Sequence, residues 1–212
     1  MLITAGPTHE AIDAVRYIAN RSSGRMGIAI AEAARDARWD VTLLLGPVCA
    51  APPEGVRVEH FTSTDDLKRL LDVHFASCDV LIMAAAVADY RPVHASSAKL
   101  PRGSGNLTLE LTPTADLVKA CAEKRQPHQR IVGFALQEPS RLDERAAKKL
   151  RDKNLDAIVA NPLETMGSGQ IAAKVFTPDG RVHSPEQGGT IDKQAFAKWL
   201  VEWIGCEVLS NR

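Results

Sequence analysis

The sequence predicts an α/β protein with a doubly wound, mostly parallel, Rossmann-like sheet that carries helices on both faces. Short apolar runs alternate along the chain with longer runs whose apolar residues have helical spacing. Several of the short runs are apolar throughout, which is typical of parallel strands that are buried on both faces. The 212 residues are enough for one sizeable domain with a well-buried core.

The expected elements alternate in chain order. Strands are predicted at residues 2–5, 41–45, 56–61, 80–84, 131–136 and 157–160. Helices are predicted between them at 27–39, 63–77, 115–125 and 142–154. The second helix follows a Thr-Ser-Thr-Asp-Asp stretch, which supplies the side chains that cap helix N-termini. This alternation indicates βαβ units with right-handed crossovers.

Two regions depart from the simple alternation. Residues 92–105 are rich in Ser, Pro and Gly and predict a flexible flap, which is followed by an alternating edge strand over 106–112. A β-hairpin is expected over 174–184, with its turn at Pro178-Asp179-Gly180. An amphipathic helix near 192–209 closes the chain. The predicted sheet therefore carries a flap and a β-hairpin accessory region.

Charge and cysteine content exclude several classes of protein. The 26 basic residues balance 26 acidic residues, which argues against a general nucleic-acid or membrane-surface binder. The cysteines are far apart and lack the spacing of a zinc site or a disulfide framework; they are Cys49, Cys78, Cys121 and Cys206. No apolar stretch reaches the length of a membrane span, and the N-terminus lacks a signal-peptide pattern. We expect a single cytoplasmic domain over 1–212, without metal-ligating side chains.

The connection after the first strand is unusually long. In a nucleotide-binding βα unit this connection takes about two to six residues, but here the helical run begins only at Gly27. The GxGxxG fingerprint is missing, and the glycines come late, in Ser22-Ser23-Gly24 directly before the helix. Backbone N–H groups and hydroxyls at a helix start can bind a phosphate. The alternative is a capped helix in which these residues only satisfy the helix's own donors.

Further candidate residues follow later strands. The fourth strand ends in the run AAAVAD at 84–89, whose small residues allow a flat ring or a ribose to approach while Asp89 accepts hydrogen bonds. The alternative is close helix packing, with Asp89 paired to Arg91. Lys99 lies in the flap, and Lys149 and Lys153 share a helix face; all are suited to phosphate, although a solvated lysine is the default interpretation.

Several long motifs give these signals a common meaning. In chain order they are ITAGPTHEAIDAVRYIANRSSGRMG, AAAVADYRP, TADLV, VGFALQE and KKLRDKNLDAIVAN. Together they resemble the bacterial phosphopantothenate–cysteine ligases (phosphopantothenoylcysteine synthetases), the ligase domain of the DNA/pantothenate metabolism flavoproteins. The resemblance implies a coenzyme A biosynthesis enzyme that joins 4′-phosphopantothenate to L-cysteine. It also implies CTP and Mg²⁺, with an acyl-cytidylate intermediate that the amine of cysteine attacks.

The resemblance also assigns site residues by motif position. Asn20, Lys99 and Arg16 take the catalytic positions: Asn20 contacts the acyl-cytidylate, Lys99 neutralises phosphate charge, and Arg16 suits a carboxylate or phosphate. The nucleotide-binding positions are Gly6, Ser22, Ser23, Gly24, Met83, Ala84, Ala85, Asp89, Lys99, Thr114, Ala115, Asp116, Leu117, Phe134, Lys149 and Lys153. Lys149 and Lys153 correspond to the pair that holds the triphosphate.

The chain differs from the usual family pattern in several places. His9, Ala11 and Ala14 replace Arg, Pro and Pro, which predicts a less rigid first loop. Leu100-Pro101-Arg102 replaces a lysine-rich stretch, and Thr114-Ala115 replaces Asn-Pro.

The resemblance bears on assembly as well. Many relatives are fused behind a flavin-dependent decarboxylase domain, whereas this chain starts at the first ligase strand. It is either a stand-alone ligase or a separately expressed ligase domain, and we expect no flavin site in either case. Relatives form dimers in which the partner closes part of the substrate site. We therefore expect a homodimer, with residues 106–112 and 174–184 as candidate contacts, because unpaired strand edges readily pair.

Two other functions remain open from the sequence. The same fold also serves NAD(P)-dependent oxidoreductases, although the missing GxGxxG weakens that alternative. A nucleotide-binding module that lacks ligase activity is also compatible with the altered loop and flap. Binding of NAD(P)H would favour the first alternative, and CTP binding without pyrophosphate release would favour the second.

Overall fold

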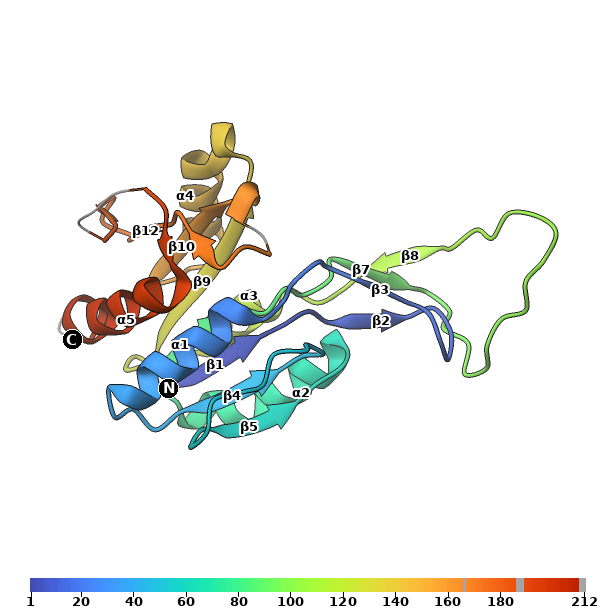
Figure 1. Ribbon diagram of the computed structural model, residues 1–212, viewed down its shortest axis with the longest axis horizontal. Coiled ribbons are helices and arrows are strands. Elements are labelled where there is room, and N and C mark those ends of the chain that lie inside the picture. Colours follow the sequence, from blue (N-terminus) through green and yellow to red (C-terminus); the bar gives the residue numbers. More distant parts are fainter. Residues whose placement is uncertain (166, 186–188, 210–212) are drawn as a thin grey trace.

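The computed structural model describes residues 1–165, 167–185 and 189–209. An eight-stranded sheet forms its centre, in the order β13-β12-β10-β9-β6-β1-β4-β5 (Figure 1). Its strands are β1 (Leu2–Ala5), β4 (Thr42–Leu45), β5 (Arg57–His60), β6 (Val80–Met83), β9 (Arg130–Gln137), β10 (Ala157–Pro162), β12 (Lys174–Phe176) and β13 (Val182–His183). Six neighbouring strands of this sheet are parallel, in the order β10, β9, β6, β1, β4 and β5. At the other edge, β12 and β13 pair in antiparallel orientation. By position in the chain, the parallel strands follow the Rossmann order 3-2-1-4-5-6. The predicted fold class is confirmed.

Helices cover both faces of this sheet. On one face lie α1 (Arg25–Asp36) and α5 (Lys193–Trp203), which continues as a π-helical turn over Ile204–Val208. On the other face lie α2 (Thr64–His74), α3 (Leu117–Lys124) and α4 (Leu142–Asp152). Short 3₁₀ turns occupy Phe75–Ser77, Pro139–Arg141 and Leu163–Thr165. Within the described residues, no helix is long and apolar enough to span a bilayer.

The central strands are apolar on both faces because each face packs on helices. Ile3 and Ile82 point into the core under α1 and α5, and both are fully buried. Leu2 and Leu81 point into the opposite core under α2, α3 and α4. This two-sided burial explains why the central runs lack the alternation of a half-exposed strand.

A projecting arm leaves the sheet beyond β1 and β6. It contains two antiparallel ribbons, β2 (His9–Ala11) with β3 (Tyr17–Ala19) and β7 (Tyr90–Pro92) with β8 (Leu111–Pro113). Figure 1 shows the ribbons extending together away from the body and ending in the connection over 93–110. We call residues 9–19 and 90–113 the arm. It contains most of the unusually long connection after β1.

The arm contains the strand predicted over 106–112 and the first loop, and the structure of both differs from the prediction or extends it. The predicted strand over 106–112 is confirmed only at Leu111 and Thr112, because strand structure begins at Leu111 and residues 106–110 belong to the connection. Its alternating leucines remain solvent-accessible, with Leu107 60% exposed. The predicted flap over 92–105 lies in the same connection, except for Pro92, which ends β7. The first loop forms the β2–β3 hairpin, in which the rings of His9 and Tyr17 stack with centroids 3.7 Å apart.

The hairpin over 174–184 is confirmed, but it extends the main sheet. Its first strand, β12, pairs with β10 as well as with β13. Gly180 adopts a left-handed φ of 84° in the turn, a conformation that glycine adopts without strain. A small ribbon of β11 (Gln170–Ile171) and β14 (Ile191–Asp192) leads into α5.

Candidate functional site

A cavity of about 860 Å³ lies at the carboxyl ends of the central strands. Its walls come from the connection after β1, the loop after β6, the start of α3, and α4. β1 and β6 are neighbours, and the chain order of the strands reverses between them. Open α/β sheets bind their ligands at this kind of switch point. The topology therefore makes this cavity the candidate site.

The start of α1 presents unused donors at this cavity. Gly24, at the N-cap, has a left-handed φ of 70°, and no side chain caps the helix within the described residues. The hydroxyl of Ser22 accepts a hydrogen bond from the Gly24 N–H at 3.4 Å instead. Ser22, Ser23 and Gly24 all line the cavity. An uncapped helix N-terminus is suited to a phosphate or another anion.

Asn20 lies where the arm meets the cavity. Its Nδ2 donates to the carbonyl oxygen of Val87 at 2.9 Å, which joins the connection after β1 to the loop after β6. Asn20 itself is exposed, and it lines the cavity together with its neighbours Arg21 and Ser22. Its amide is thus held at the cavity edge, where it can contact a bound molecule.

The loop after β6 forms a wall of small residues whose backbone is held in place. The Thr4 hydroxyl accepts from the Ala85 N–H at 3.0 Å and donates to Met83 Sδ at 3.4 Å. On the other side, the Thr114 hydroxyl donates to the Ala88 carbonyl. Because this wall carries only small side chains, a flat ring or a ribose can approach its backbone.

The opposite wall is cationic. Lys153 Nζ forms an ion pair with Asp116 Oδ2 at 3.0 Å, and Asp116 also caps α3. Lys149 is half-buried, and no carboxylate of the described residues forms an ion pair with it. Burial, and secondarily the charge of Lys153, lowers the pKa of Lys149. A bound anion would provide the negative charge that Lys149 lacks.

Sequence reasoning missed five further polar residues of the cavity, which are Arg21, Arg25, Asn161, Thr165 and Lys193. Lys193 Nζ donates to the Ser168 carbonyl at 2.6 Å, and burial, followed by the charge of Arg25, lowers its pKa. Arg25 is the first residue of α1 and directly follows Ser22-Ser23-Gly24, where a basic residue beside exposed N–H groups is a usable signal. Lys193 belongs to the C-terminal helix, and nothing in its local sequence points to the cavity.

The structure separates the residues that were predicted from the sequence into two groups. Fifteen of them line the cavity: Asn20, Ser22, Ser23, Gly24, Met83, Ala84, Ala85, Asp89, Thr114, Ala115, Asp116, Leu117, Phe134, Lys149 and Lys153. Gly6 supports it from behind, with a φ of 84° and its carbonyl accepting from the Ala86 N–H at 2.9 Å. Arg16 and Lys99 lie on the arm and do not line the cavity. A single chain therefore does not bring these two together with Asn20.

The cavity favours anions. The carboxylates that line it belong to Asp89 and Asp116, whereas the cations are Arg21, Arg25, Lys149, Lys153 and Lys193. Within the described part of the chain, no three His, Cys, Asp or Glu side chains form a group that could hold a metal ion. Any divalent ion here would therefore need most of its ligands from a bound molecule.

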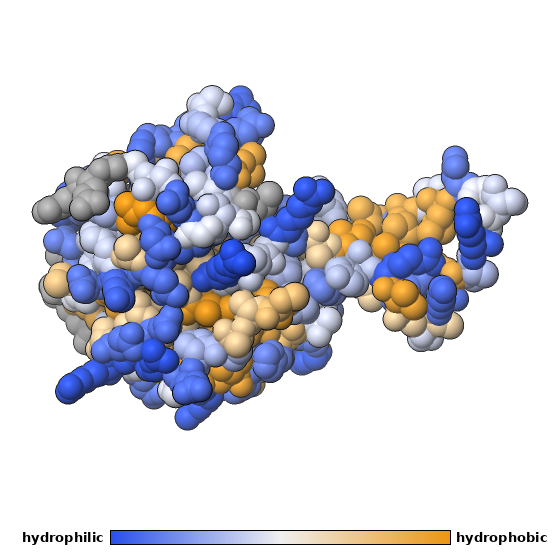
Figure 2. Space-filling model, viewed as in Figure 1, coloured by the Kyte–Doolittle hydropathy of each residue, from blue (hydrophilic) through white to orange (hydrophobic). Residues whose placement is uncertain are grey.

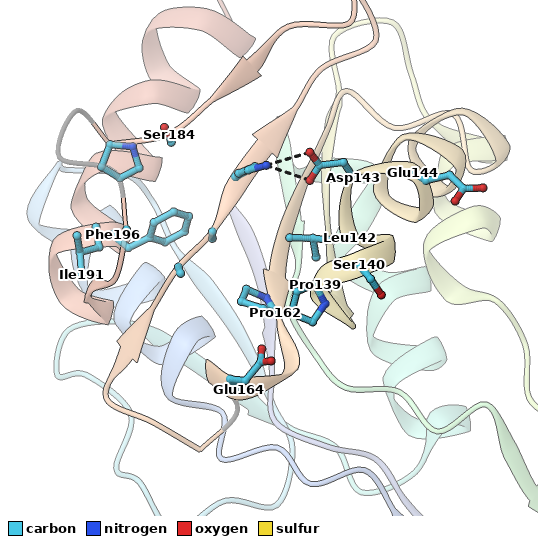
Figure 3. Close-up of a pocket in the computed structure, with 15 residues that line it drawn as sticks. Pro139, Ser140, Leu142, Asp143, Glu144, Pro162, Glu164, Ser184, Ile191 and Phe196 are labelled. Atoms are coloured by element: carbon cyan, nitrogen blue, oxygen red, sulfur yellow. Dashed lines mark hydrogen bonds and ion pairs between the residues drawn. The ribbon is translucent and has the colours of Figure 1, made fainter.

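A second cavity, of about 660 Å³, has the opposite character (Figure 3). Lys174 of β12 forms an ion pair with Asp143 at 2.9 Å, and dashed lines mark it at Asp143 in Figure 3. Glu144 and Glu164 add negative charge, and Phe196 lies in its apolar part. This acidic rim repels phosphate, so the cationic cavity at the switch point remains the candidate site.

Comparison with known proteins agrees with this architecture. A family model described as the DNA/pantothenate metabolism flavoprotein C-terminal domain matches residues 1–206. The chain is 43% identical over 171 residues to the coenzyme A biosynthesis bifunctional protein CoaBC of Bacillus subtilis, covering 80% of this chain and 41% of that protein. It is 44% identical over 170 residues to a cysteine/cysteine sulfinic acid decarboxylase of an unknown prokaryotic organism, covering 80% and 47%. The chain thus spans about half the length of the curated relatives it matches.

A solved structure matches almost end to end. The crystal structure of the C-terminal domain of the bifunctional protein CoaBC superposes with a TM-score of 0.84 at 35% sequence identity. The match covers 100% of this chain and 95% of that one.

Proposed function

Because the chain belongs to the DNA/pantothenate metabolism flavoprotein C-terminal domain family, we propose that it joins 4′-phosphopantothenate to L-cysteine with CTP. In the proposed reaction, the substrate carboxylate attacks the α-phosphate of CTP and pyrophosphate leaves. The amine of cysteine then attacks the carbonyl of the acyl-cytidylate, which gives 4′-phosphopantothenoylcysteine and CMP. Activation is needed because a carboxylate oxygen leaves readily only after it is bonded to phosphate.

The cationic cavity at the switch point is the observation that carries this proposal. Lys149 and Lys153 are suited to the triphosphate, and the uncapped start of α1 adds donors for a phosphate group. The small wall at Ala84 and Ala85 leaves room for the nucleoside, and Asp89 can accept hydrogen bonds from its hydroxyls or amine. We propose that Asn20, whose Nδ2 donates to the Val87 carbonyl, also donates to the acyl intermediate.

Magnesium fits this cavity only together with the nucleotide. Mg²⁺ is commonly held by one or two carboxylates and by substrate phosphates. Asp89 and Asp116 are the carboxylates available for that role, and Asp116 is already paired with Lys153. We propose that phosphate oxygens supply most of its ligands, and that the ion stabilises the departing pyrophosphate.

The arm supports a homodimer in which the partner completes the site. Arg16 and Lys99 stand on the arm, away from the cavity of their own chain. The arm also carries exposed large apolar side chains, namely Val15, Tyr17, Tyr90, Val93, Leu107, Leu109 and Leu111. Figure 2 shows apolar surface gathered along this projecting part of the molecule. Exposed apolar surface of this kind favours association, so we propose that each arm reaches the cavity of the other chain.

A pyrophosphate-release assay tests the proposal. The protein is incubated with Mg²⁺, 4′-phosphopantothenate and L-cysteine, with CTP and ATP in parallel. We expect pyrophosphate release with CTP that depends on 4′-phosphopantothenate. Release with neither nucleotide would refute the ligase function.

The same preparation distinguishes the alternatives. CTP binding by calorimetry without pyrophosphate release would indicate a nucleotide-binding module, and saturable NAD(P)H binding would indicate an oxidoreductase. Release of carbon dioxide from cysteine alone would instead match the decarboxylase activity in the name of one relative.

All four cysteines are free thiols, which suits the reducing cytoplasm that we propose as the site of action.

A further inference from the structure

One carboxylate organises the turn between β2 and β3. The Asp13 side chain is fully buried, with 0% of its surface exposed, whereas Arg16 is 44% exposed. Asp13 Oδ1 accepts hydrogen bonds from the backbone N–H groups of Val15 and Arg16, both at 2.8 Å. Its Oδ2 accepts from Arg16 Nε at 2.9 Å and also from Arg16 Nη2.

The same carboxylate reaches the connection between β7 and β8, over 93–110. The backbone N–H of Leu100 donates to Asp13 Oδ2 at 3.1 Å, and Arg16 Nη2 donates to the Leu100 carbonyl at 3.1 Å. Nearby, the Ser96 N–H donates to the Ile12 carbonyl at 3.0 Å. Residues 96–100 of the long connection are therefore tied to the turn at three points. Lys99 is the covalent neighbour of the residue that Asp13 holds.

These contacts require a charged carboxylate. Asp13 accepts from several N–H groups at once, which a carboxylate with two oxygens can do and a neutral amide cannot. The pKa of Asp13 is held well below its usual range, mainly by the hydrogen bond from the Arg16 side chain. The backbone N–H groups of Val15, Arg16 and Leu100 lower it further. Removal of the charge leaves Arg16 and Leu100 without their shared acceptor.

We propose that Asp13 is a positioning residue of the ligase reaction, which fixes Arg16 and Lys99 relative to one another on the arm. This inference rests on the proposed function. Asp13 is buried in the turn and acts only through the residues that it holds. It ties the backbone beside Lys99 to the turn that carries Arg16, so that the two cationic side chains can be presented together to a phosphorylated substrate.

The Asp13→Asn variant tests this role. Asparagine keeps an acceptor for the Val15 and Arg16 N–H groups, but its NH₂ group faces the Arg16 guanidinium and the Leu100 N–H. We expect kcat for pyrophosphate release to fall about 10- to 100-fold, because small displacements of reacting groups cost this much. The KM for CTP should change less than about threefold, because the cavity that binds CTP is separate from the turn.

The chain offers a matched control in the β12–β13 turn. Asp179 also pairs with an arginine two residues on, and it accepts from both Arg181 Nε and the Arg181 backbone N–H. Asp179→Asn should leave kcat and KM unchanged, because this turn lies outside the cavity and outside the arm, to which the proposed dimer contact is assigned. An Asp13→Asn enzyme with the kcat of wild type would overturn the proposal.

A triple variant separates positioning from a general structural effect. If Asp13 acts only through Arg16 and Lys99, adding Asp13→Asn to Arg16→Gln/Lys99→Gln should cause no further loss of kcat. A loss that multiplies in the triple variant would overturn the proposal, because it would show that Asp13 acts independently of the two cations.

Limited trypsin digestion distinguishes failure of this inference from failure of the proposed function. Release of Leu100 from Asp13 should speed cleavage of the Lys99–Leu100 bond about tenfold in Asp13→Asn but not in Asp179→Asn. Unchanged cleavage would overturn the inference even in an active ligase. Faster cleavage in a protein whose wild type releases no pyrophosphate would overturn the reaction and retain the tether between Asp13 and Leu100.

Discussion

Lys149 is the residue at which folding and binding oppose each other most clearly. Its half-buried ammonium has a lowered pKa, chiefly from burial and then from the charge of Lys153. Folding therefore disfavours the charged form of Lys149. Retaining a cation at this position lowers stability, which is common where a site needs charge for its ligand.

Lys149→Met removes this opposition. We expect a melting temperature about 2–4 °C higher, the shift that accompanies about 1 kcal/mol in a chain of this size. We also expect CTP to bind about tenfold more weakly, a loss of about 1.4 kcal/mol, measured by calorimetry. Lys148→Met is the matched control, since Lys148 is exposed and paired with Asp152, and both quantities should change little. A lower melting temperature for Lys149→Met would contradict the argument.

The pH dependence of CTP binding follows from the same lysine. Below its folded-state pKa, Lys149 is charged and attracts the triphosphate; above it, the neutral amine does not. Because this pKa is lowered, CTP affinity should begin to fall at a lower pH than an ordinary lysine, with a pKa of about 10.4, would allow. Titrations of CTP between about pH 8 and 10 measure this effect. Lys149→Met should show a flatter profile, and an identical profile would exclude Lys149 as its source.

At the scale of elements, the contact of α1 with β1 positions the helix start that faces the cavity. Gly27 sits at this contact, where an added Cβ would lie 2.5 Å from Ala5 Cβ and 3.0 Å from the Thr4 carbonyl oxygen. These atoms belong to the backbone of β1 or are bonded directly to it, so they cannot move aside as the end of a flexible side chain could. Any side chain at this position must push α1 away from β1.

Gly27→Ala should therefore destabilise the protein. Overpacking costs about 1–3 kcal/mol, which outweighs the helix-propensity gain of up to about 1 kcal/mol. Thermal unfolding should show a lower melting temperature, together with weaker CTP binding because α1 shifts. Gly205→Ala is the control, since a Cβ there meets nothing within 4 Å. Equal melting temperatures for the two variants would contradict this account of the contact.

The elements predicted best from the sequence are those whose burial is visible in the residue types of the element itself. β1, β6 and β9 were found because burial on both faces produces continuous apolar runs. The predicted strand over 106–112 was wrong over 106–110, because alternating leucines also arise on an exposed apolar connection. β2 and β3 were missed because three residues are too few to show a period.

The site was predictable to a similar extent. Residues that share a motif with the strand ends, such as Ser22 and Ala85, do line the cavity. Lys193 was not found, because only the packing of α5 brings it to the cavity. The absence of Lys99 from the cavity lining was not foreseeable either, since the pairing within the two arm ribbons sets the direction of the arm.

At the scale of the whole molecule, the residues of the proposed active site are distributed between the body and the arm. The body holds the cavity, and the arm holds Lys99 and Arg16. If each arm acts on the partner's cavity, the two sets of residues can be inactivated in different chains and combined again.

Mixed dimers test this division. Lys99→Gln and Lys149→Gln should each be poorly active alone. After mixing, unfolding and refolding in equal amounts, half of the dimers combine both chains, and each such dimer has one intact composite site. Activity should therefore recover to about one quarter of wild type, as expected for random pairing in a two-fold dimer. No recovery in refolded mixed dimers, verified by mass, would place Lys99 in the cavity of its own chain.

The projecting arm has one last consequence. Its ribbons pair with each other and leave apolar side chains such as Leu107 and Tyr17 uncovered, while both cores lie in the body. Under the proposed function, a single chain can then be fully folded and still inactive, because its cavity lacks the partner's arm. Specific activity should fall on dilution while circular dichroism stays constant. The rate per chain becomes a function of how much of the protein the cell holds, so synthesis level alone can set a threshold for turnover.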